Sequence, residues 1–275
     1  MPNHLNREDG AGWFYARSSR WVQLDPTNFH LEEEVGTEQS TEENQGNRII
    51  NGLPAATRER VMAQMTRVSL KTGAVLFEPG EVITRVHFPL SGVISLVTLF
   101  ADGNTVEVAA VGNEGIVGVP LRAGGRFTVR AISQVAGATL AMDVGTFLAE
   151  SGSDGPLRAL VQNYTLALFG QISQAVACNR LHSNEQRLSR WLLMSGDRLG
   201  EDEFAISHHV LGQMLGSSPA TVNLTAGVLQ TAGLINYRRG RVTIRDRAGL
   251  EKAACVCYGV IRELFESSAS RSHPL

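Results

Sequence analysis

The hydrophobic pattern of the chain changes period along its length, and these changes divide it into folded parts. Between Arg67 and Met142, apolar residues fall in short runs that end at Gly, Pro or Asp-Gly turns, as is typical of strands. Short strands joined by glycine-rich turns favour a β-roll or barrel-like jelly roll. We predict a short helix within 48–66, followed by strands at 68–70, 75–77, 86–88, 93–100, 106–111, 127–135 and 139–142.

A helical period begins near residue 156. Apolar residues then recur at helical spacing, which predicts one long helix over 156–182. Ser183 and Gln186 have the spacing of a capping box, so a second helix starts there and turns Trp191 inward. The apolar stripe of the long helix consists of Leu157, Leu160, Val161, Tyr164, Leu168, Ile172, Ala175 and Val176.

Two shorter helices follow within 206–237. Ser207 and Ser218 are suited to cap their N-termini, and Gly216 and Gly233 to end them. Two helices joined by a short glycine-containing turn form a helix-turn-helix, whose second helix enters the DNA major groove. The residues expected to face inward are Val210, Leu211, Leu215, Val222, Val228 and Leu229.

A basic hairpin and a last helix complete the pattern. Short apolar runs at 235–237 and 242–244 flank Arg238-Arg239-Gly240-Arg241, which predicts a small hairpin, or wing. One helix over 247–265 and a polar tail follow.

Several segments carry a family resemblance. LGQMLGSSPATV, VLQTAGLI and RRGRVTIRDRAGL resemble the winged helix-turn-helix of the Crp/Fnr (catabolite-activator-like) family of bacterial regulators. HSNEQRLSRWLL resembles the segment after that family's dimerisation helix, while LKTGAVLFEPGE and VHFPLSGVISLV resemble its cyclic-nucleotide-binding-like β-roll. The resemblance implies an α+β fold with a β-roll sensor domain over 48–150, a dimerisation helix over 151–182 and a winged helix-turn-helix DNA-binding domain over 183–275.

The resemblance also implies a function. It predicts a transcription regulator that acts as a homodimer on double-stranded DNA, with RNA polymerase and a small effector of unknown identity as further partners. In the family the long helix pairs with its twofold mate; the alternative is an ordinary buried helix. The dimer interface is therefore expected at Leu157, Val161, Tyr164, Leu168, Ile172 and Ala175.

Cyclic AMP is not the expected effector. Family members that bind it hold the ribose with a Glu and the phosphate with an Arg-Ser or Arg-Thr pair. Here Val117 stands at the ribose position, and no such pair follows. Arg126 and Arg130 are the candidate effector contacts because a phosphate needs charge-assisted donors. The simpler interpretation is that both are exposed loop arginines.

The three cysteines argue against a metal centre. An iron–sulfur cubane needs four thiolates, whereas the chain has only Cys178, Cys255 and Cys257. Residues two apart on one helix point about 200° apart, so Cys255 and Cys257 are not expected to share a metal. The seven histidines show no ligand spacing with them. We expect structural cysteines and no cofactor. GxSxG, phosphate-loop and HExxH motifs are missing, so no catalytic residue is expected.

The predicted recognition helix is uncharged. No Asp, Glu, Lys or Arg occurs within 206–237, although Arg is the commonest reader of guanine. Two alternatives follow: a sensor or scaffold that has lost specific DNA binding, or a regulator that responds to thiol redox state. The expected base contacts are Ser217, Ser218, Thr221, Asn223, Leu224 and Thr225, and the expected phosphate contacts are Arg187, Arg190, Arg238, Arg239 and Arg241.

The first 47 residues differ in composition from the rest. They hold three Arg against nine acidic residues, and their apolar residues follow neither a helical nor a strand period. We therefore predict a disordered acidic leader over 1–47. The remainder has 22 basic and 18 acidic residues, too small an excess for a non-specific DNA coat protein. We expect a cytoplasmic protein without a membrane partner, because no signal-peptide core and no apolar run of ~20 residues is present.

Overall fold

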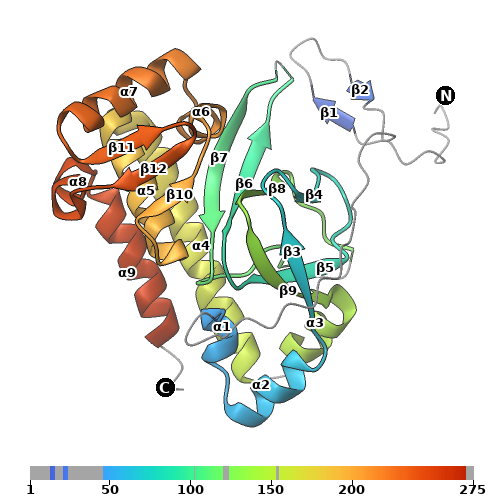
Figure 1. Ribbon diagram of the computed structural model, residues 1–275. Coiled ribbons are helices and arrows are strands. Elements are labelled where there is room, and N and C mark those ends of the chain that lie inside the picture. Colours follow the sequence, from blue (N-terminus) through green and yellow to red (C-terminus); the bar gives the residue numbers. More distant parts are fainter. Residues whose placement is uncertain are drawn as a thin grey trace, which may run out of the picture.

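The computed structural model describes residues 13–15, 21–23, 46–101, 103–119, 124–152 and 155–270. These residues form a β-roll, a long helix and a helical C-terminal part with a small sheet of its own (Figure 1). Most of the leader, and the prediction that it is disordered, lies outside the described residues. Two short strands within it, β1 (Trp13–Tyr15) and β2 (Trp21–Gln23), pair antiparallel where we predicted no strand.

Two antiparallel sheets build the β-roll, with the orders β3-β9-β5 and β4-β8-β6-β7. Fully buried Phe88, Ile94 and Met142 come from both sheets, so the core lies between them. All the predicted strands form, although β8 begins later than predicted because Phe127 leaves the sheet and accepts a hydrogen bond from the Gly80 N–H. The strands are β3 (Thr66–Leu70), β4 (Val75–Phe77), β5 (Arg85–Pro89), β6 (Val93–Leu99), β7 (Thr105–Val111), β8 (Arg130–Val135) and β9 (Gly137–Asp143).

Three short helices close one end of the β-roll: α1 (Arg48–Asn51), α2 (Ala55–Met62) and α3 (Val144–Gly152) (Figure 1). The predicted helix over 48–66 is thus two helices, interrupted before Pro54, and α3 was not predicted. Asn47 caps α1, and its side-chain amide donates to Pro89 O at 3.1 Å and Gly115 O at 2.8 Å. The folded body therefore includes Asn47, which the sequence assigned to the leader.

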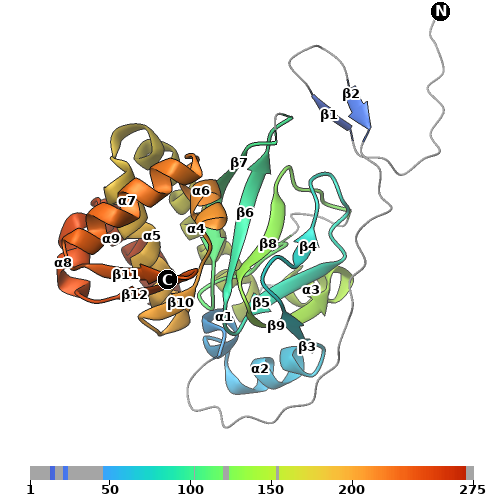
Figure 2. The ribbon, with the colours of Figure 1, turned by 45° about the horizontal axis from the view of Figure 1, so that its top comes forward.

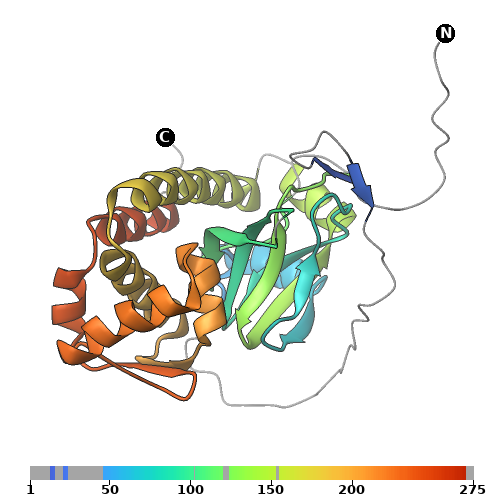
Figure 3. The ribbon, with the colours of Figure 1, turned by 90° about the horizontal axis from the view of Figure 1, so that it is seen from above.

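The long helix, α4 (Pro156–Leu181), lies beside α9 (Cys257–Ser270) and packs against it (Figures 1 and 3). Tyr164 and Phe265 bring their rings within 6.2 Å of each other, centroid to centroid. The two helices run antiparallel because Cys257 lies near the end of α4 and Phe265 near its middle. The last helix of the chain is thus part of the same layer as the long helix.

The C-terminal part surrounds a second section of core and lies beside the β-roll (Figure 2). Leu192, Leu211 and Val222 are buried in it as predicted, but Val228 is 54% exposed, so its predicted inward position is wrong. A short strand, β10, was not predicted and pairs with β12. The elements are α5 (Asn184–Leu199), β10 (Glu203–Ala205), α6 (His208–Leu215), α7 (Pro219–Thr231), β11 (Ile235–Arg238), β12 (Arg241–Ile244) and α8 (Arg247–Ala253).

The predicted single helix over 247–265 is wrong. α8 ends at Ala253, Ala254 is extended with ψ 157°, and α9 begins only at Cys257. The chain leaves helical structure over 254–256, and Cys255 and Cys257 are both buried while Val256 between them is 74% exposed. The argument that a helix separates the two thiols therefore fails.

Candidate nucleic-acid interface

The predicted caps fix α6 and α7. Ser207 Oγ accepts from the Val210 N–H and Ser218 Oγ from the Thr221 N–H, each at 3.2 Å. Gly216 ends α6 in the left-handed conformation, with φ 56°, which a side chain would strain. The predicted helix-turn-helix therefore forms through local hydrogen bonds that the sequence itself specifies.

The outer side of α7 is exposed and uncharged. Ser218, Asn223 and Leu224, predicted as base contacts, lie exposed there, with Leu224 75% exposed. Ser217 and Thr221 are half-buried. Thr225 is buried and donates its hydroxyl to Thr221 O at 2.8 Å. Its predicted base contact is wrong, because the inner side of α7 holds it.

Two of the predicted phosphate contacts serve the protein's own structure. Arg187 is buried, and its guanidinium donates to Leu215 O at 2.5 Å and to Asn184 Oδ1 at 3.3 Å. This ties α5 to the end of α6, so a phosphate contact from Arg187 is not available. Arg190 is half-buried and donates to Met194 Sδ at 3.5 Å.

The wing keeps its arginines at the surface. Arg238 ends β11 and Arg239 lies on the turn to β12, at a positive φ of 52°; both are exposed. Arg241 is exposed as well, but its guanidinium pairs with the Glu203 carboxylate of β10 at 3.0 Å. Arg238 and Arg239 are thus the predicted phosphate contacts that stay best placed for that role.

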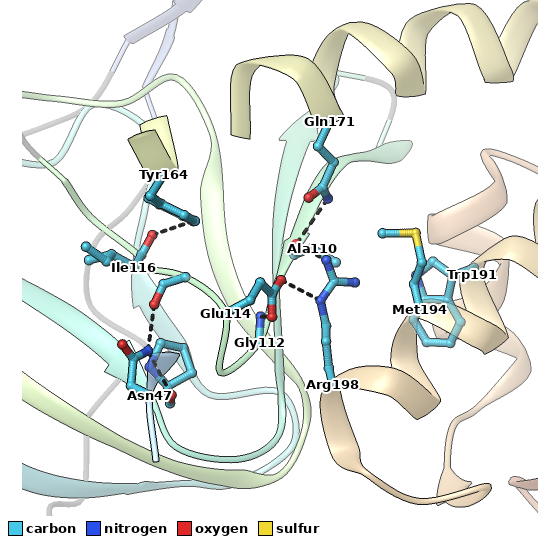
Figure 4. Close-up of polar contacts among 12 residues, drawn as sticks. Asn47, Ala110, Gly112, Glu114, Ile116, Tyr164, Gln171, Trp191, Met194 and Arg198 are labelled. Carbon is cyan, nitrogen blue, oxygen red and sulfur yellow. Dashed lines mark hydrogen bonds and ion pairs between the residues drawn. The ribbon is translucent and has the colours of Figure 1, made fainter. Parts of the chain in front are cut away.

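A buried ion pair joins the C-terminal part to the β-roll (Figure 4). Arg198 of α5 pairs with Glu114 at 2.7 Å and also donates to Ala110 O at 2.9 Å; both side chains are less than a tenth exposed. Gln171 of α4 donates to the same carbonyl at 3.0 Å. A Cβ at Gly112 would lie 2.6 Å from Arg198 Cγ, so only glycine allows this close approach. Sequence reasoning missed this junction, although the Gly112 to Gly115 turn was its signal.

A second carboxylate lies at the same boundary. Glu107 of β7 accepts from the Trp191 indole N–H of α5 at 3.1 Å and from the Ser95 hydroxyl. Met214 of α6 also contacts Ser95, with Sδ 3.7 Å from Oγ. Burial raises the pKa of Glu107 from about 4.5 to about 7, although both hydrogen bonds oppose the rise. This carboxylate therefore titrates near neutrality while it links both helices to the β-roll.

The predicted effector residues are engaged within the β-roll. Arg126 donates to Gly80 O, and Arg130 pairs with Glu78 at 2.7 Å. Val117 is buried, and its backbone pairs with His87. Tyr164 of α4 donates to Ile116 O beside it at 2.8 Å (Figure 4). The segment aligned with the nucleotide-binding cassette thus packs against the long helix.

The predicted dimer residues divide along α4. Leu157, Val161 and Tyr164 are buried in the core of a single chain, and Leu168, Ile172 and Ala175 are half-buried. The opposite side of α4 is exposed and apolar instead. It presents Leu166, Phe169, Val176 and Leu181, each at least 69% exposed.

The fold and the capped helix pair define a class of protein: a β-roll joined by a long helix to a winged helix-turn-helix DNA-binding domain. Residues 186–253 match the family model of the Crp-like helix-turn-helix domain. No curated protein sequence matches the chain.

Solved structures share the fold at low sequence identity. FixK2 from Bradyrhizobium japonicum superposes with a TM-score of 0.61 at 17% identity, over 70% of this chain and 98% of that one. A CRP-family transcriptional regulator from Thermus thermophilus, TTHB099, gives 0.59 at 18% identity, over 69% and 96%. The c-di-GMP-responsive global regulator CLP from Xanthomonas campestris gives 0.57 at 17%, over 70% and 100%.

The domain match and the shared fold confirm the resemblance predicted from the sequence: residues 186–253 form a Crp-like helix-turn-helix domain, and the chain has the fold of these solved regulators. Within the described residues, no helix combines the length and apolar character needed to cross a membrane.

Proposed function

We propose that the protein acts as a homodimer that binds double-stranded DNA through α7 and the wing, and that the β-roll controls this binding through α5 and α6. The observation that carries the proposal is that α7 is buried on one side and exposed on the other. Val222, Thr225 and Leu229 hold one side in the core, whereas Asn223 and Leu224 remain exposed on the other. A recognition helix needs this arrangement to enter a groove.

The exposed groups set the chemistry of recognition. Ser218 and Asn223 offer hydrogen bonds to base edges, and Leu224 offers an apolar contact to a thymine methyl. Arg238 and Arg239 supply charge for phosphates. Since α7 carries no Arg, we propose that phosphate contacts and DNA shape contribute more to binding than direct guanine readout.

The dimer is proposed to form along the exposed side of α4. Leu166, Phe169 and Val176 make an apolar surface that spans several turns of the helix, and such a surface favours a protein contact over solvent. The half-buried Leu168 and Ile172 flank it. This moves the proposed interface around the helix from the stripe that the sequence pattern picked out.

A second candidate function is a sensor or scaffold that keeps the fold without specific DNA binding. It is favoured by the exposed Leu224 and Val228 on a helix with no charged residue in 206–237. An apolar surface of this kind also suits a protein partner.

Selection of duplexes from a random DNA pool by the purified full chain separates the two functions. A DNA-binding regulator enriches one related set of sequences, whereas a scaffold returns the pool unchanged. Light scattering on the same sample tests the dimer. The double variant Leu166→Glu with Phe169→Glu should be monomeric, while Phe100→Glu, which charges an exposed aromatic residue beyond β6, should not change the mass. A wild-type monomer would refute the dimer.

A further inference from the structure

Four residues with metal-binding side chains meet where the long helix ends. Cys178 and His182 are four residues apart, at the end of α4 and at its C-cap, so they lie on the same side of the helix. Cys255 lies in the link between α8 and α9, and Cys257 is the first residue of α9. The chain thus brings together ligands from two segments that are 77 residues apart.

The distances fit a single ion. The three sulfurs and one His182 ring nitrogen all lie within 4.8 Å of one another. Cys178 Sγ lies 3.5 Å from Cys255 Sγ, and Cys257 Sγ lies 3.5 Å from His182 Nδ1. A tetrahedral zinc with Zn–S bonds of ~2.3 Å and Zn–N bonds of ~2.0 Å separates its ligand atoms by roughly 3.5–3.8 Å. A polynuclear iron–sulfur cluster would need the thiolates farther apart, because each would bind a different iron.

The burial of these residues suits a closed structural site. All three thiols are buried, and they form a cluster separate from the main apolar core. His182 is half-buried and closes the outer side. Structural zinc sites have this character, with four protein ligands and no open position.

The surroundings favour thiolates. Gln174 Nε2 donates to Cys257 Sγ at 3.1 Å, as an outer-shell partner of a metal ligand does. Arg190 also interacts electrostatically with Cys178. Arg187 interacts electrostatically with Cys178 and Cys255. Three thiolates around a divalent ion leave one negative charge, which these two arginines offset.

We propose that Cys178, His182, Cys255 and Cys257 bind one divalent ion of the zinc type in a tetrahedral Cys3His site. Each cysteine binds as a thiolate and releases its proton to solvent, and His182 binds through the neutral imidazole. The ion joins the end of α4 to the α8–α9 link, next to the start of α5. It therefore fixes the point at which the DNA-binding domain is attached, whether or not the proposed dimer forms.

Cobalt titration of the reduced, chelator-treated full chain tests the site. We expect thiolate-to-cobalt charge-transfer absorption and the visible bands of a tetrahedral ion, saturating at one cobalt per chain and abolished by one equivalent of zinc. His182→Gln and Cys257→Ser should weaken cobalt binding by at least ~10–100-fold, the loss that even outer-shell changes cause. Asn179→Ala, an exposed change on the same turn of α4, should bind like the wild type.

Several results would overturn the proposal. One is the absence of a charge-transfer band in the reduced wild-type chain, a measurement that depends on no variant. Another is a Cys178–Cys255 disulfide in freshly purified protein that contains no metal, because the cysteines would then act as a redox pair. A third is acid-labile sulfide with more than one iron per chain, which would indicate a cluster. Melting of the wild-type chain with and without zinc adds an independent readout, since bound metal must raise its Tm.

Discussion

The DNA-binding domain uses charge in opposite ways on its two sides. The inner side, made by α5 and α6, buries Arg187 and Arg198 and gives each a hydrogen-bonded partner. The outer side presents α7, whose helix-turn-helix carries no charged residue, and the wing, where Arg238 and Arg239 are exposed. We had expected Arg187 of α5 to contact phosphate, but it holds α5 against the end of α6 instead.

This difference between buried and exposed arginines indicates that one side of the domain fixes its orientation and the other contacts DNA. A buried ion pair gives little net stability, but it is costly to break, so it holds two bodies in one arrangement. Exposed arginines on a turn attract any phosphate backbone without reading its sequence. The inner side therefore sets the position of the domain, and the outer side sets how tightly it holds DNA.

The largest expected effect comes from breaking the inner ion pair. Arg198→Ala leaves the Glu114 carboxylate buried without its partner, and we expect the free energy of unfolding to fall by about 3–5 kcal/mol in urea titrations. The control is Arg198→Met combined with Glu114→Gln, which removes both charges and should recover most of the loss. A fall below ~1 kcal/mol in the single variant would mean that the pair does not hold the two parts together.

The next effect concerns the wing. Arg238→Ala with Arg239→Ala should weaken all DNA sequences about equally. It should also flatten the plot of log K against log salt by about 0.9 for each phosphate that the wing no longer neutralises. Arg58→Ala with Arg60→Ala removes the same charge from α2 and should leave the slope unchanged. Loss of binding to one sequence only would instead assign base readout to the wing.

A smaller effect is expected from adding to α7 a side chain that can recognise a base. Leu224→Arg places a guanidinium at a position of the helix that is 75% exposed, where it should favour guanine at the facing base pair by ~1–3 kcal/mol. Leu224→Gln is the matched polar control without charge. Competition between duplexes that differ at one base pair measures the discrimination. If Leu224→Arg strengthens every duplex alike, this position faces a phosphate.

The smallest effect is a pH dependence of the inner contact. Because burial raises the pKa of Glu107 to about 7, the folded chain holds this proton more tightly than the unfolded chain. The resulting stability is present below the unfolded value near 4.5 and is lost as the pH rises through 7. Because Glu107 is only half-buried, solvent screens part of this effect, and between roughly pH 5 and pH 8 the wild type should lose about 1–2 kcal/mol relative to Glu107→Gln. Parallel stability curves for the two proteins would contradict the raised pKa.

Local features of the site could be predicted from the sequence. Ser207, Ser218 and Gly216 act on backbone groups within a few residues, so the caps and the turn of the helix-turn-helix were predicted correctly. The strands of the β-roll were predicted for the same reason. Their alternation and turn residues are short-range signals.

The sequence could not predict whether a side chain contacts its own chain or another molecule. A helical period shows that α4 has an apolar side, but not whether that side meets the same chain or a second copy. Leu157 and Tyr164 meet the chain's own core, while Leu166 and Phe169 are exposed. Arg187 was equally ambiguous, because its acceptor, Leu215 O, lies 28 residues away.

The helix break was the other feature that the sequence concealed. Residues 247–265 contain no Pro to mark a break, and we predicted one helix across them. The chain instead leaves helical structure over 254–256, with Cys255 and Cys257 both buried. Only the three-dimensional arrangement brings the four potential ligands together, since sequence spacing places Cys178 and His182 far from the other two.

The polypeptide enters the DNA-binding domain at His182 and leaves it at Cys257, whose Sγ lies 3.5 Å from His182 Nδ1. A unit whose two ends meet is a self-contained insertion: evolution or an engineer can exchange it for another without lengthening the host chain. The same geometry bears on motion. If the domain rotates about this point, neither the connection at His182 nor the one at Cys257 is stretched. The range of the rotation is therefore limited by the contacts of α5 and α6 with the β-roll and not by the length of the connections.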